Sequence, residues 1–299
     1  MTGIIIVDKP EGITSFRAVS RVRGIVGEKK AGHCGTLDPM AEGILPVMLG
    51  GATRFLEFLP TSPKKYRAGL KLGVRTDTLD ITGTVLETNE VSVGAVELTA
   101  ALEQFRGDIL QIPPMYSAIK KDGVRMYDLA RKGVEVERDA RPVTIYGLDL
   151  ISSNDEEHTY VLDIECSSGT YVRTLIDDLG TALGCGAVMT SLRRTAVGCF
   201  DAENAVTLEE LETAAGADAL SPILIPTDRV LSMYGAVRVT KAQGVRFRNG
   251  GELDLERMSV PEQESLLYRM YMPDGTFLGL GERDDAAGQM KIKRVFVGR

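Results

Sequence analysis

The sequence of 299 residues lacks the signals of several large protein classes. It contains no run of about 18 apolar residues, which a membrane-spanning helix needs. Its first residues do not form a basic segment followed by an apolar one, as a secretory leader does. No GxGxxG motif follows a predicted strand, no Walker A sequence occurs and no internal repeat is present. We therefore expect a cytoplasmic protein that neither crosses a membrane nor is secreted, and functions based on a nucleotide cofactor have no support.

Candidate metal ligands are also scarce. The chain has two histidines and four cysteines, and no CxxC pair occurs among Cys34, Cys166, Cys185 and Cys199. Zinc sites in proteins are built from closely spaced cysteines and histidines. We therefore expect no metal site, and we expect reduced thiols of the kind that cytoplasmic proteins carry.

Basic residues are distributed unevenly along the chain. The net charge is −7, yet residues 1–141 carry 20 Lys and Arg against 18 Asp and Glu, whereas residues 142–299 carry 15 against 24. The basic residues cluster near glycine-rich or aromatic segments, at Lys29-Lys30, Lys64-Lys65-Tyr66-Arg67, Lys120-Lys121, Arg131-Lys132 and Arg193-Arg194. Such pairs are commonly solvated surface, but this placement also suits contacts with phosphates. The composition thus permits a nucleic-acid partner without requiring one.

Predicted strands and helices follow one another without the steady alternation of a doubly wound protein. β-Branched or alternating runs predict strands at residues 3–7, 66–73, 84–87, 142–152 and 159–166. Helical spacing predicts helices after Thr14, at residues 98–105, at residues 172–183 and after a capping box of Thr207 with Glu210. The first of these helices has an apolar stripe of Phe16, Val19, Val22 and Val26. This order favours an α+β fold.

Two further segments divide the chain. Residues 113–142 combine prolines, paired lysines and a helical piece around residues 126–132, and we expect them to leave the core and to be mobile until a partner binds. Residues 221–226 contain two prolines and resemble a linker. Beyond them, a helix at residues 240–247 and a hairpin of residues 266–272 and 277–282 predict a small β-rich unit. We therefore expect domains at residues 1–230 and 235–299.

The most informative segment is residues 32–47, GHCGTLDPMAEGILPV. Gly32 and Gly35 permit backbone angles that other residues avoid, and Pro39 suits the first position of a helix. Asp38 would then be the N-cap, where an aspartate stabilises a helix by about 1 kcal/mol. Taken alone, this segment favours a capping role for Asp38 over catalysis, and a lone His33 is typical of a structural residue.

This segment is one of four that together resemble the TruB family of tRNA pseudouridine-55 synthases. The other three are VDKPEGITS at residues 7–15, KKYRAGLKLGVRTDTLDITG at residues 64–83 and CSSGTYVRTLIDDLG at residues 166–180. Residues 113–133 and 192–198 are similar too, so the resemblance covers residues 3–230 in order and spacing. It implies a catalytic domain of the pseudouridine-synthase type with a mixed, mainly antiparallel sheet, followed by a small PUA-like domain.

The resemblance implies an RNA isomerase. Family members convert uridine in the T-loop of tRNA to pseudouridine by breaking the C1′–N1 bond and forming a C1′–C5 bond, without a metal or organic cofactor. Asp38 is then the nucleophile at C1′ or the base that takes the C2′ proton, and either role requires an ionised carboxylate. Arg173 would pair with Asp38 and keep it charged. Tyr66 would stack on the target base or accept its proton. Without the resemblance, Arg173 is typical of a surface residue on the polar side of its helix. Tyr66 is then as typical of an aromatic residue packed in the core as of a site residue.

Four further residues are implied in substrate binding. Tyr171 and Leu192 match positions that shape the uracil pocket, and Lys9, by itself a turn residue, matches a lysine near the cleft. The target nucleotide must leave its base stack, at a cost of a few kcal/mol, and His33 would fill the vacated space without transferring a proton. Glu42 stands where the family often has threonine, and we expect its carboxylate to face solvent.

The implied partner is the T-arm of tRNA, recognised mostly by shape and phosphate. Residues 113–142 correspond to the family's thumb, which closes on the T-arm, and the enzyme would be a monomer with no obligatory protein partner. Three alternatives remain: a catalytic subunit guided by box H/ACA RNA, a non-catalytic RNA-binding or tRNA-folding protein, and a small-molecule hydrolase built on Asp38 and His33. The presence of Asp38, Tyr66 and Arg173 together disfavours the non-catalytic protein. The hydrolase would give no reason for the basic thumb or for the C-terminal RNA-binding-like unit.

Overall fold

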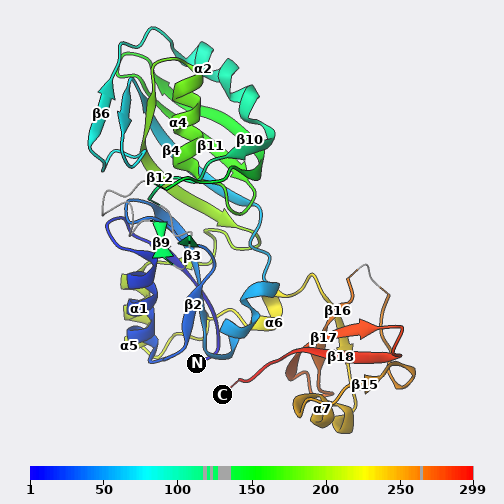
Figure 1. Ribbon diagram of the computed structural model, residues 1–299. Helices are drawn as coiled ribbons and strands as arrows, with labels where there is room; N and C mark the ends of the chain where they lie inside the picture. The colour runs from blue at the N-terminus through cyan, green and yellow to red at the C-terminus, as the bar shows by residue number, and fades with distance from the viewer. Residues whose placement is uncertain (117–119, 122–123, 127–135, 263–264, 299) are drawn as a thin grey trace.

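The computed structural model describes the whole chain except residues 117–119, 122–123, 127–135, 263–264 and 299. Within the described residues, the larger of its two main sheets has nine strands in the order β13-β1-β3-β12-β4-β11-β10-β7, with β2 beside β3 (Figure 1). Two of its pairs, β1 with β13 and β3 with β12, are parallel, and its other pairs are antiparallel. These strands are β1 (Gly3–Lys9), β2 (Ala31–His33), β3 (Glu42–Leu49), β4 (Lys64–Leu72), β7 (Gly107–Gln111), β10 (Arg141–Asn154), β11 (Thr159–Cys166), β12 (Ala187–Val197) and β13 (Ala205–Val206).

This mixed, mainly antiparallel arrangement confirms the predicted α+β class. The connecting helices are α1 (Ser15–Val26), η1 (Gly50–Phe58), α2 (Ala95–Leu102), η2 (Glu103–Phe105), α4 (Val172–Ala182), α5 (Leu208–Gly216) and α6 (Thr227–Val230). Two small ribbons pair β5 (Val74–Thr76) with β6 (Val85–Thr88), and β8 (Lys120–Lys121) with β9 (Val124–Arg125). The predicted helical piece around residues 126–132 lies almost wholly outside the described residues.

Different helices cover the two halves of the large sheet (Figure 1). Helices α2 and α4 bury their apolar residues in one core with β4, β10 and β11. Helices α1 and α5 share a second core with β1 and β3. Between these halves, β12 pairs with β3 on one side and β4 on the other, so this strand, which the sequence pattern missed, joins the two halves.

Helix α1 begins and ends where its sequence indicates. The Thr14 hydroxyl accepts a hydrogen bond from the Arg17 amide at 3.1 Å, and the helix ends at Gly27, whose φ of 65° suits glycine. The buried stripe contains Val19 and Val22 together with Ser15 and Ala18. Phe16, by contrast, is 75% exposed, so its predicted place on the apolar stripe is wrong.

The segment around Asp38 is not a helix. Asp38 and Pro39 lie in a turn, closed by a 3.1 Å hydrogen bond from the Ala41 amide to the Asp38 carbonyl, and β3 begins at Glu42. The predicted helix is wrong because residues 43–49 are all buried and pair with β1 along their whole length, while the other side of β3 pairs with β12 at its start and with β2 at its end. A continuous apolar run of this kind is typical of a central strand.

The end of the chain forms a second sheet of five strands within the described residues, in the order β14-β16-β17-β18-β15. Its elements are β14 (Gly235–Arg238), α7 (Lys241–Arg248), β15 (Leu253–Asp254), η3 (Leu255–Arg257), β16 (Leu267–Tyr271), β17 (Phe277–Asp284) and β18 (Gln289–Val295). These bounds confirm the predicted helix, hairpin and β-rich character. The PUA-like identity and the exact domain limits stay predictions.

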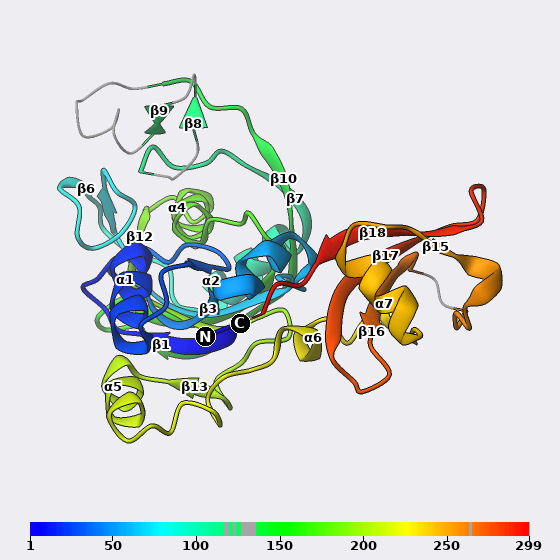
Figure 2. The same cartoon turned by 90° about the horizontal axis from the view of Figure 1, so that it is seen from below.

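The second sheet lies beside the first part of the chain in Figure 2, and aromatic packing joins it to η1. The ring of Phe55 from η1 lies 5.8 Å from that of Phe277 and 6.0 Å from that of Phe296. The predicted linker is also tied down, because Ile225 and Ile4 exchange two backbone hydrogen bonds of 2.8 and 2.9 Å. The C-terminal sheet is therefore packed against the first part of the chain and is not merely tethered to it.

The close approach of β3 to β12 requires glycine at position 43. Gly43 has a φ of +102°, and a Cβ atom there would clash with the backbone oxygen of Arg194. Gly12 has a φ of +84° but open space around it. We expect Gly12→Ala to cost about 1–2 kcal/mol of unfolding free energy for the backbone angle. Gly43→Ala should cost about 1–3 kcal/mol more because of the clash. Urea denaturation of both variants tests this, and equal losses would contradict it.

Candidate active site

The loop that carries Asp38 joins β2 to β3 and is held through its backbone. The hydroxyl of Ser15 donates to the Leu37 carbonyl at 3.0 Å and accepts from the Leu37 amide at 2.8 Å. On the other side of Asp38, the Gly12 amide donates to the Pro39 carbonyl at 2.8 Å. The N-terminal turn of α1 therefore fixes the peptides on both sides of the carboxylate.

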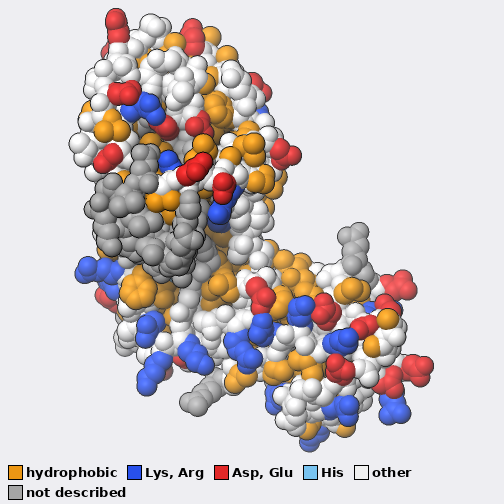
Figure 3. Space-filling view, in the orientation of Figure 1, with side chains coloured by type: hydrophobic (Ala, Val, Ile, Leu, Met, Phe, Trp, Pro, Cys, Tyr) orange, Lys and Arg blue, Asp and Glu red, His pale blue; other side chains and the backbone are white. Residues whose placement is uncertain are grey.

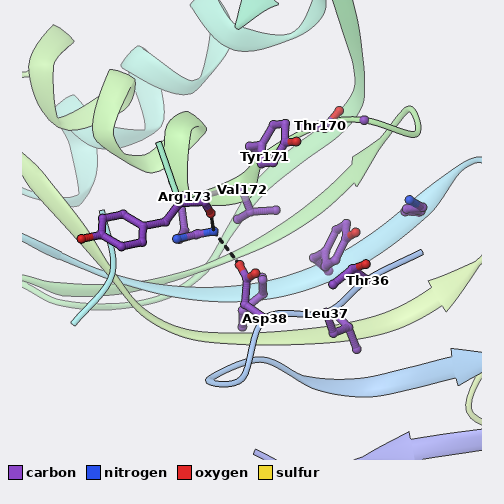
Figure 4. Close-up of a pocket in the computed structure, with 12 residues that line it drawn as sticks. Thr36, Leu37, Asp38, Thr170, Tyr171, Val172 and Arg173 are labelled. Atoms are coloured by element: carbon purple, nitrogen blue, oxygen red, sulfur yellow. Dashed lines mark hydrogen bonds and ion pairs between the residues drawn. The ribbon is translucent and has the colours of Figure 1, made fainter. Parts of the chain in front are cut away.

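Arg173, the second residue of α4, lies directly against Asp38 (Figure 4). Its Nη2 atom is 2.8 Å from the Asp38 Oδ2 atom and donates to the Tyr116 carbonyl at 2.9 Å. Its Nη1 atom is 3.4 Å from the Asp80 Oδ2 atom and donates to the Thr78 carbonyl at 3.1 Å. The arginine is 6% exposed, so the alternative of a solvent-exposed surface residue is wrong.

Asp80, between β5 and β6, is a site residue that the sequence analysis missed. Its side chain is buried, and its Oδ1 atom accepts hydrogen bonds from the Thr78 hydroxyl at 2.9 Å and the Thr82 amide at 3.1 Å. The carboxylate is thus fixed on one side and faces Arg173 on the other. The available signal was the spacing of aspartates and threonines in TDTLDITG, one of the segments that carry the family resemblance.

The charge of Asp38 depends on Arg173. Burial raises the pKa of Asp38, because a carboxylate removed from water loses hydration. The Arg173 guanidinium opposes this rise most strongly, Asp80 adds to it, and Lys9 opposes it more weakly. The Asp38 side chain remains 37% exposed, so one face of the carboxylate is open.

A cavity of about 230 Å³ lies over this open face (Figure 4). Three of the predicted site residues line it together with Asp38 and Arg173: Tyr66 from β4, Tyr171 at the start of α4, and Leu192 from β12. Two aromatic rings and a leucine thus surround one paired carboxylate. Such a lining suits a flat, partly apolar group with a reacting atom placed beside the carboxylate.

The start of α4 is held by a residue that sequence patterns did not identify. The Gln111 side chain is buried, accepts a hydrogen bond from the Tyr171 amide at 3.0 Å and donates to the Tyr171 carbonyl at 3.3 Å. This amide pair fixes the backbone from which Tyr171 and the neighbouring Arg173 project. Gln111 ends β7, so the edge of the large sheet contributes directly to the geometry of the site.

Burial disfavours charge on other residues of the cavity. It raises the pKa of Tyr66, against the opposing effect of Arg194, so the phenol is neutral near pH 7. Burial also lowers the pKa of Lys64, which lines the same cavity. The predicted basic cluster at residues 64–67 therefore places one lysine inside the site, while the neighbouring Lys65 is exposed.

Lys9 and His33 lie outside the cavity lining. Lys9 is fully buried, and its ammonium donates to the carbonyls of Pro10 and Ile13, each at 2.8 Å. Burial lowers the pKa of Lys9 to about 8, although Asp38 opposes this shift. Lys9 has no exposed surface in this structure, and its contact with a substrate stays a prediction. His33 ends β2, and burial lowers its pKa, so its ring is neutral near pH 7.

The paired arginines of β12 have different environments. Arg193 binds Asp8 at 2.5 Å and Glu42 at 3.2 Å. Glu42 is half-exposed, which agrees with the expectation that it faces solvent. Arg194 has no exposed surface, so a phosphate contact by this residue is excluded.

The described residues contain no cluster of metal-ligating side chains. They contain no group of three or more His, Cys, Asp or Glu side chains placed to hold an ion, and the four cysteines are free thiols. Within the same residues, no helix is both long enough and apolar enough to cross a membrane.

Family models match most of the chain. The model of the N-terminal domain of TruB family pseudouridylate synthases matches residues 23–172, and the model of the tRNA pseudouridylate synthase B C-terminal domain matches residues 173–232. The large mixed sheet is therefore that of a pseudouridine synthase, which is an isomerase.

Individual relatives narrow this class. The chain is 42% identical to tRNA pseudouridine synthase B of Escherichia coli (strain K12) and of Shigella flexneri serotype 5b (strain 8401), over 99% of this chain and 96% of each relative. It belongs to the TruB family.

Solved structures share the fold. A chain of a Cbf5-Nop10-Gar1 complex superposes with a TM-score of 0.74 at 25% identity, covering 99% of this chain and 85% of that one. A chain of an H/ACA RNP bound to a substrate RNA containing 2′-deoxyuridine gives a TM-score of 0.73 at 23% identity, with coverages of 99% and 86%.

Removal of the arginine should move the acid limb of activity. Arg173 lowers a pKa that burial has raised, so Arg173→Gln raises the pKa of Asp38 further. If catalysis needs the ionised carboxylate, activity is lost as the pH falls through that pKa. The acid limb of kcat/KM should then move upward by about one pH unit or more.

The control is Arg75→Gln, which breaks a 3.0 Å pair with Asp177 outside the cavity. It should leave the pH profile in place. An acid limb that is the same in wild type and Arg173→Gln, with both proteins folded, would show that Arg173 does not set the charge of Asp38.

Proposed function

We propose that this chain isomerises the uridine at position 55 in the T-loop of tRNA to pseudouridine. The observation that carries the proposal is the Asp38 carboxylate, held 2.8 Å from buried Arg173 and open to a cavity lined by aromatic and apolar side chains. The curated relatives, which are named for the same reaction class on tRNA, support it over nearly the whole chain. A small-molecule hydrolase built on Asp38 and His33 has no support, because His33 does not line the cavity.

The chemistry requires one ionised group at the ribose. The C1′–N1 bond breaks, the uracil turns and C5 bonds to C1′. The proton on C5 is then lost and N1 gains a proton, so the product has the composition of the substrate. Asp38 supplies either an electron pair to C1′ or a base for the C2′ proton. Both routes start from the carboxylate, and Arg173 favours that form.

Tyr66 is proposed to stack on the target base. Its ring lies in the cavity wall, and burial raises the pKa of its hydroxyl. A neutral phenol is a poor base near pH 7, which favours stacking over acceptance of the C5 proton. Tyr171 and Leu192 would close the remaining sides of the uracil pocket.

His33 and Lys9 take roles away from the reacting atoms. A nucleotide that reacts at C1′ and C5 must first leave its stack. We propose that the neutral ring of His33 fills the space left in the T-loop, since this role needs shape and no proton transfer. For Lys9, burial supports a structural role, in which its ammonium holds the turn before α1 and adds positive charge near Asp38.

The T-arm would contact the face that bears exposed cations. Lys and Arg side chains gather on the lower left of the molecule in the view of Figure 3, where α1 lies. Exposed Arg17, Arg23, Lys29 and Lys30 belong to this helix and the turn after it. Such groups bind the phosphate backbone without reading its sequence. Residues 113–142 would act as the thumb, and residues 235–299 as a PUA-like RNA-binding domain.

We further propose a stand-alone monomer that works on tRNA in the cytoplasm. Identity of 42% with single proteins named tRNA pseudouridine synthase B, over 96% of their length, favours this over a guide-RNA subunit. The similarity to chains in Cbf5 and H/ACA complexes is lower, at 23–25% identity. The purified chain alone should therefore modify a T-arm stem-loop.

Pseudouridine formation by matched carboxylate variants tests the proposal. The purified chain is incubated with unmodified tRNA or a T-arm stem-loop, and pseudouridine is mapped by carbodiimide chemistry or mass spectrometry. Asp38→Asn removes the reacting carboxylate and should lower the rate by about 10⁴-fold or more. Glu42→Gln removes a half-exposed carboxylate that pairs with Arg193, and should change the rate by less than about threefold.

Three outcomes would count against the proposal. Pseudouridine formation by Asp38→Asn at the wild-type rate would refute the role of Asp38. Binding of tRNA by the wild-type chain without modification would favour an RNA-binding or RNA-folding protein. Activity that appears only with an added guide RNA would refute the stand-alone assignment.

A further inference from the structure

We propose that Arg194 is a positioning residue for the isomerisation, because one buried guanidinium holds the loop of Asp38 against β3 from the strand position that pairs with Tyr66. This inference rests on the proposed function, since it concerns how that site keeps its geometry. It differs from the roles given to Arg173, because Arg194 makes no ion pair with Asp38 and does not itself line the cavity.

The first observation is the set of carbonyl groups around Arg194. Its Nε atom donates to the carbonyl of Ile44 in β3 at 2.8 Å. Its Nη2 and Nη1 atoms reach the carbonyls of Gly35 and Thr36 at 3.1 and 3.5 Å. Gly35 and Thr36 come just before Asp38, so the arginine ties the start of this loop to the strand that follows it.

The second observation is the contact with Tyr66. The guanidinium of Arg194 lies close enough to the Tyr66 hydroxyl to oppose the rise that burial causes in the pKa of Tyr66. The backbone of Arg194 also pairs with Gly43 of β3 and with Tyr66 of β4. The same residue therefore contacts the strand of the proposed stacking ring and the loop of the proposed nucleophile.

The third observation is the energetic cost of this arrangement. Arg194 is fully buried, and among the described residues no carboxylate lies within ion-pair distance of it. Burial lowers its pKa, and Tyr66 and Cys34 are the groups that oppose this shift. A buried charge without an opposite charge destabilises a fold by several kcal/mol. Stability alone therefore does not explain an arginine here.

The chemistry of arginine does explain it. A guanidinium presents five N–H donors in one rigid plane, and lysine presents a flexible point charge. Only the planar group reaches three carbonyls that lie in different directions. Without these donors, the carbonyls of Gly35 and Thr36 would lose their hydrogen bonds to Arg194, which would allow the loop to shift. Displacement of a catalytic group by about 1 Å can reduce a rate about a hundredfold.

The test compares Arg194→Met, Arg194→Lys and the matched control Arg193→Met. Arg193 is the neighbouring, half-exposed arginine on the opposite face of β12. Single-turnover rates and dissociation constants are measured on a T-arm stem-loop, and the folded fraction is measured by urea denaturation. We expect Arg194→Met to lower the single-turnover rate about a hundredfold, with unchanged affinity for RNA. Arg194→Lys should recover part of the rate, and Arg193→Met should behave like wild type.

A double-mutant cycle with Tyr66→Phe supplies a second measurement. Tyr66→Phe removes only the hydroxyl, whose pKa Arg194 lowers, and Arg194→Lys keeps the charge in the fold. Coupled residues give rate effects that are not additive. If Arg194→Met does not fold, the cycle with Arg194→Lys decides: non-additive effects support the proposal, and additive effects overturn it.

Other results would also overturn the inference. A single-turnover rate of Arg194→Met equal to wild type would show that the loop holds its geometry without the arginine. A loss that matches the loss of folded protein would show a purely structural role. Wild-type protein that makes no pseudouridine would instead refute the proposed function, so the two failures are distinguishable.

Discussion

The ion pair between Asp38 and Arg173 is the contact on which the geometry of the site depends. Four segments far apart in the sequence meet at this one guanidinium: the loop of Asp38, the turn with Thr78 and Asp80, the carbonyl of Tyr116, and the start of α4. A buried guanidinium that loses its carboxylate partner destabilises the fold by about 3–5 kcal/mol. The pair therefore restrains the chain around the cavity as well as the charge of the carboxylate.

Local sequence signals predicted the elements whose stability is local. The cap of Thr14 on α1 and the capping box of Thr207 on α5 are both present, because the hydrogen bonds concerned span three residues. The segment after Asp38 shows the limit of such signals. Its Asp-Pro pair is typical of a helix start, but the apolar residues that follow are needed in the middle of the large sheet. Tertiary pairing with β1 and β12 outweighs the local preference.

The sequence predicted the site residues whose side chains would act on the substrate. It did not predict the residues that hold the backbone of the site in place. Asp38, Tyr66 and Arg173 were identified by their segments, and the structure brings all three to one cavity. Gln111 and Arg194 hold backbone groups 60 and about 150 residues away, and no pattern in a single sequence marks such partners.

Arg193-Arg194 shows why strand assignment matters for interpreting charge. Two adjacent basic residues were interpreted as a surface pair suited to phosphate. Successive residues of a strand point to opposite faces of a sheet. Once β12 is recognised as a central strand, one arginine must face away from solvent, and Arg194 is the one that is buried.

Burial favours the proposed role of Tyr66 and works against the proposed role of Asp38. It raises the pKa of both Asp38 and Tyr66, because both groups ionise to anions and the cavity wall supplies little water. For Tyr66 the rise keeps the ring neutral, as a stacking surface requires. For Asp38 it works against the reaction, since a protonated carboxyl group neither attacks C1′ nor takes a proton. Arg173 lies where it counters the rise at Asp38 directly, whereas Tyr66 has only Arg194, whose donors are shared with three carbonyls. Because only Asp38 has an arginine paired directly with it, the site favours a charged Asp38 and a neutral Tyr66.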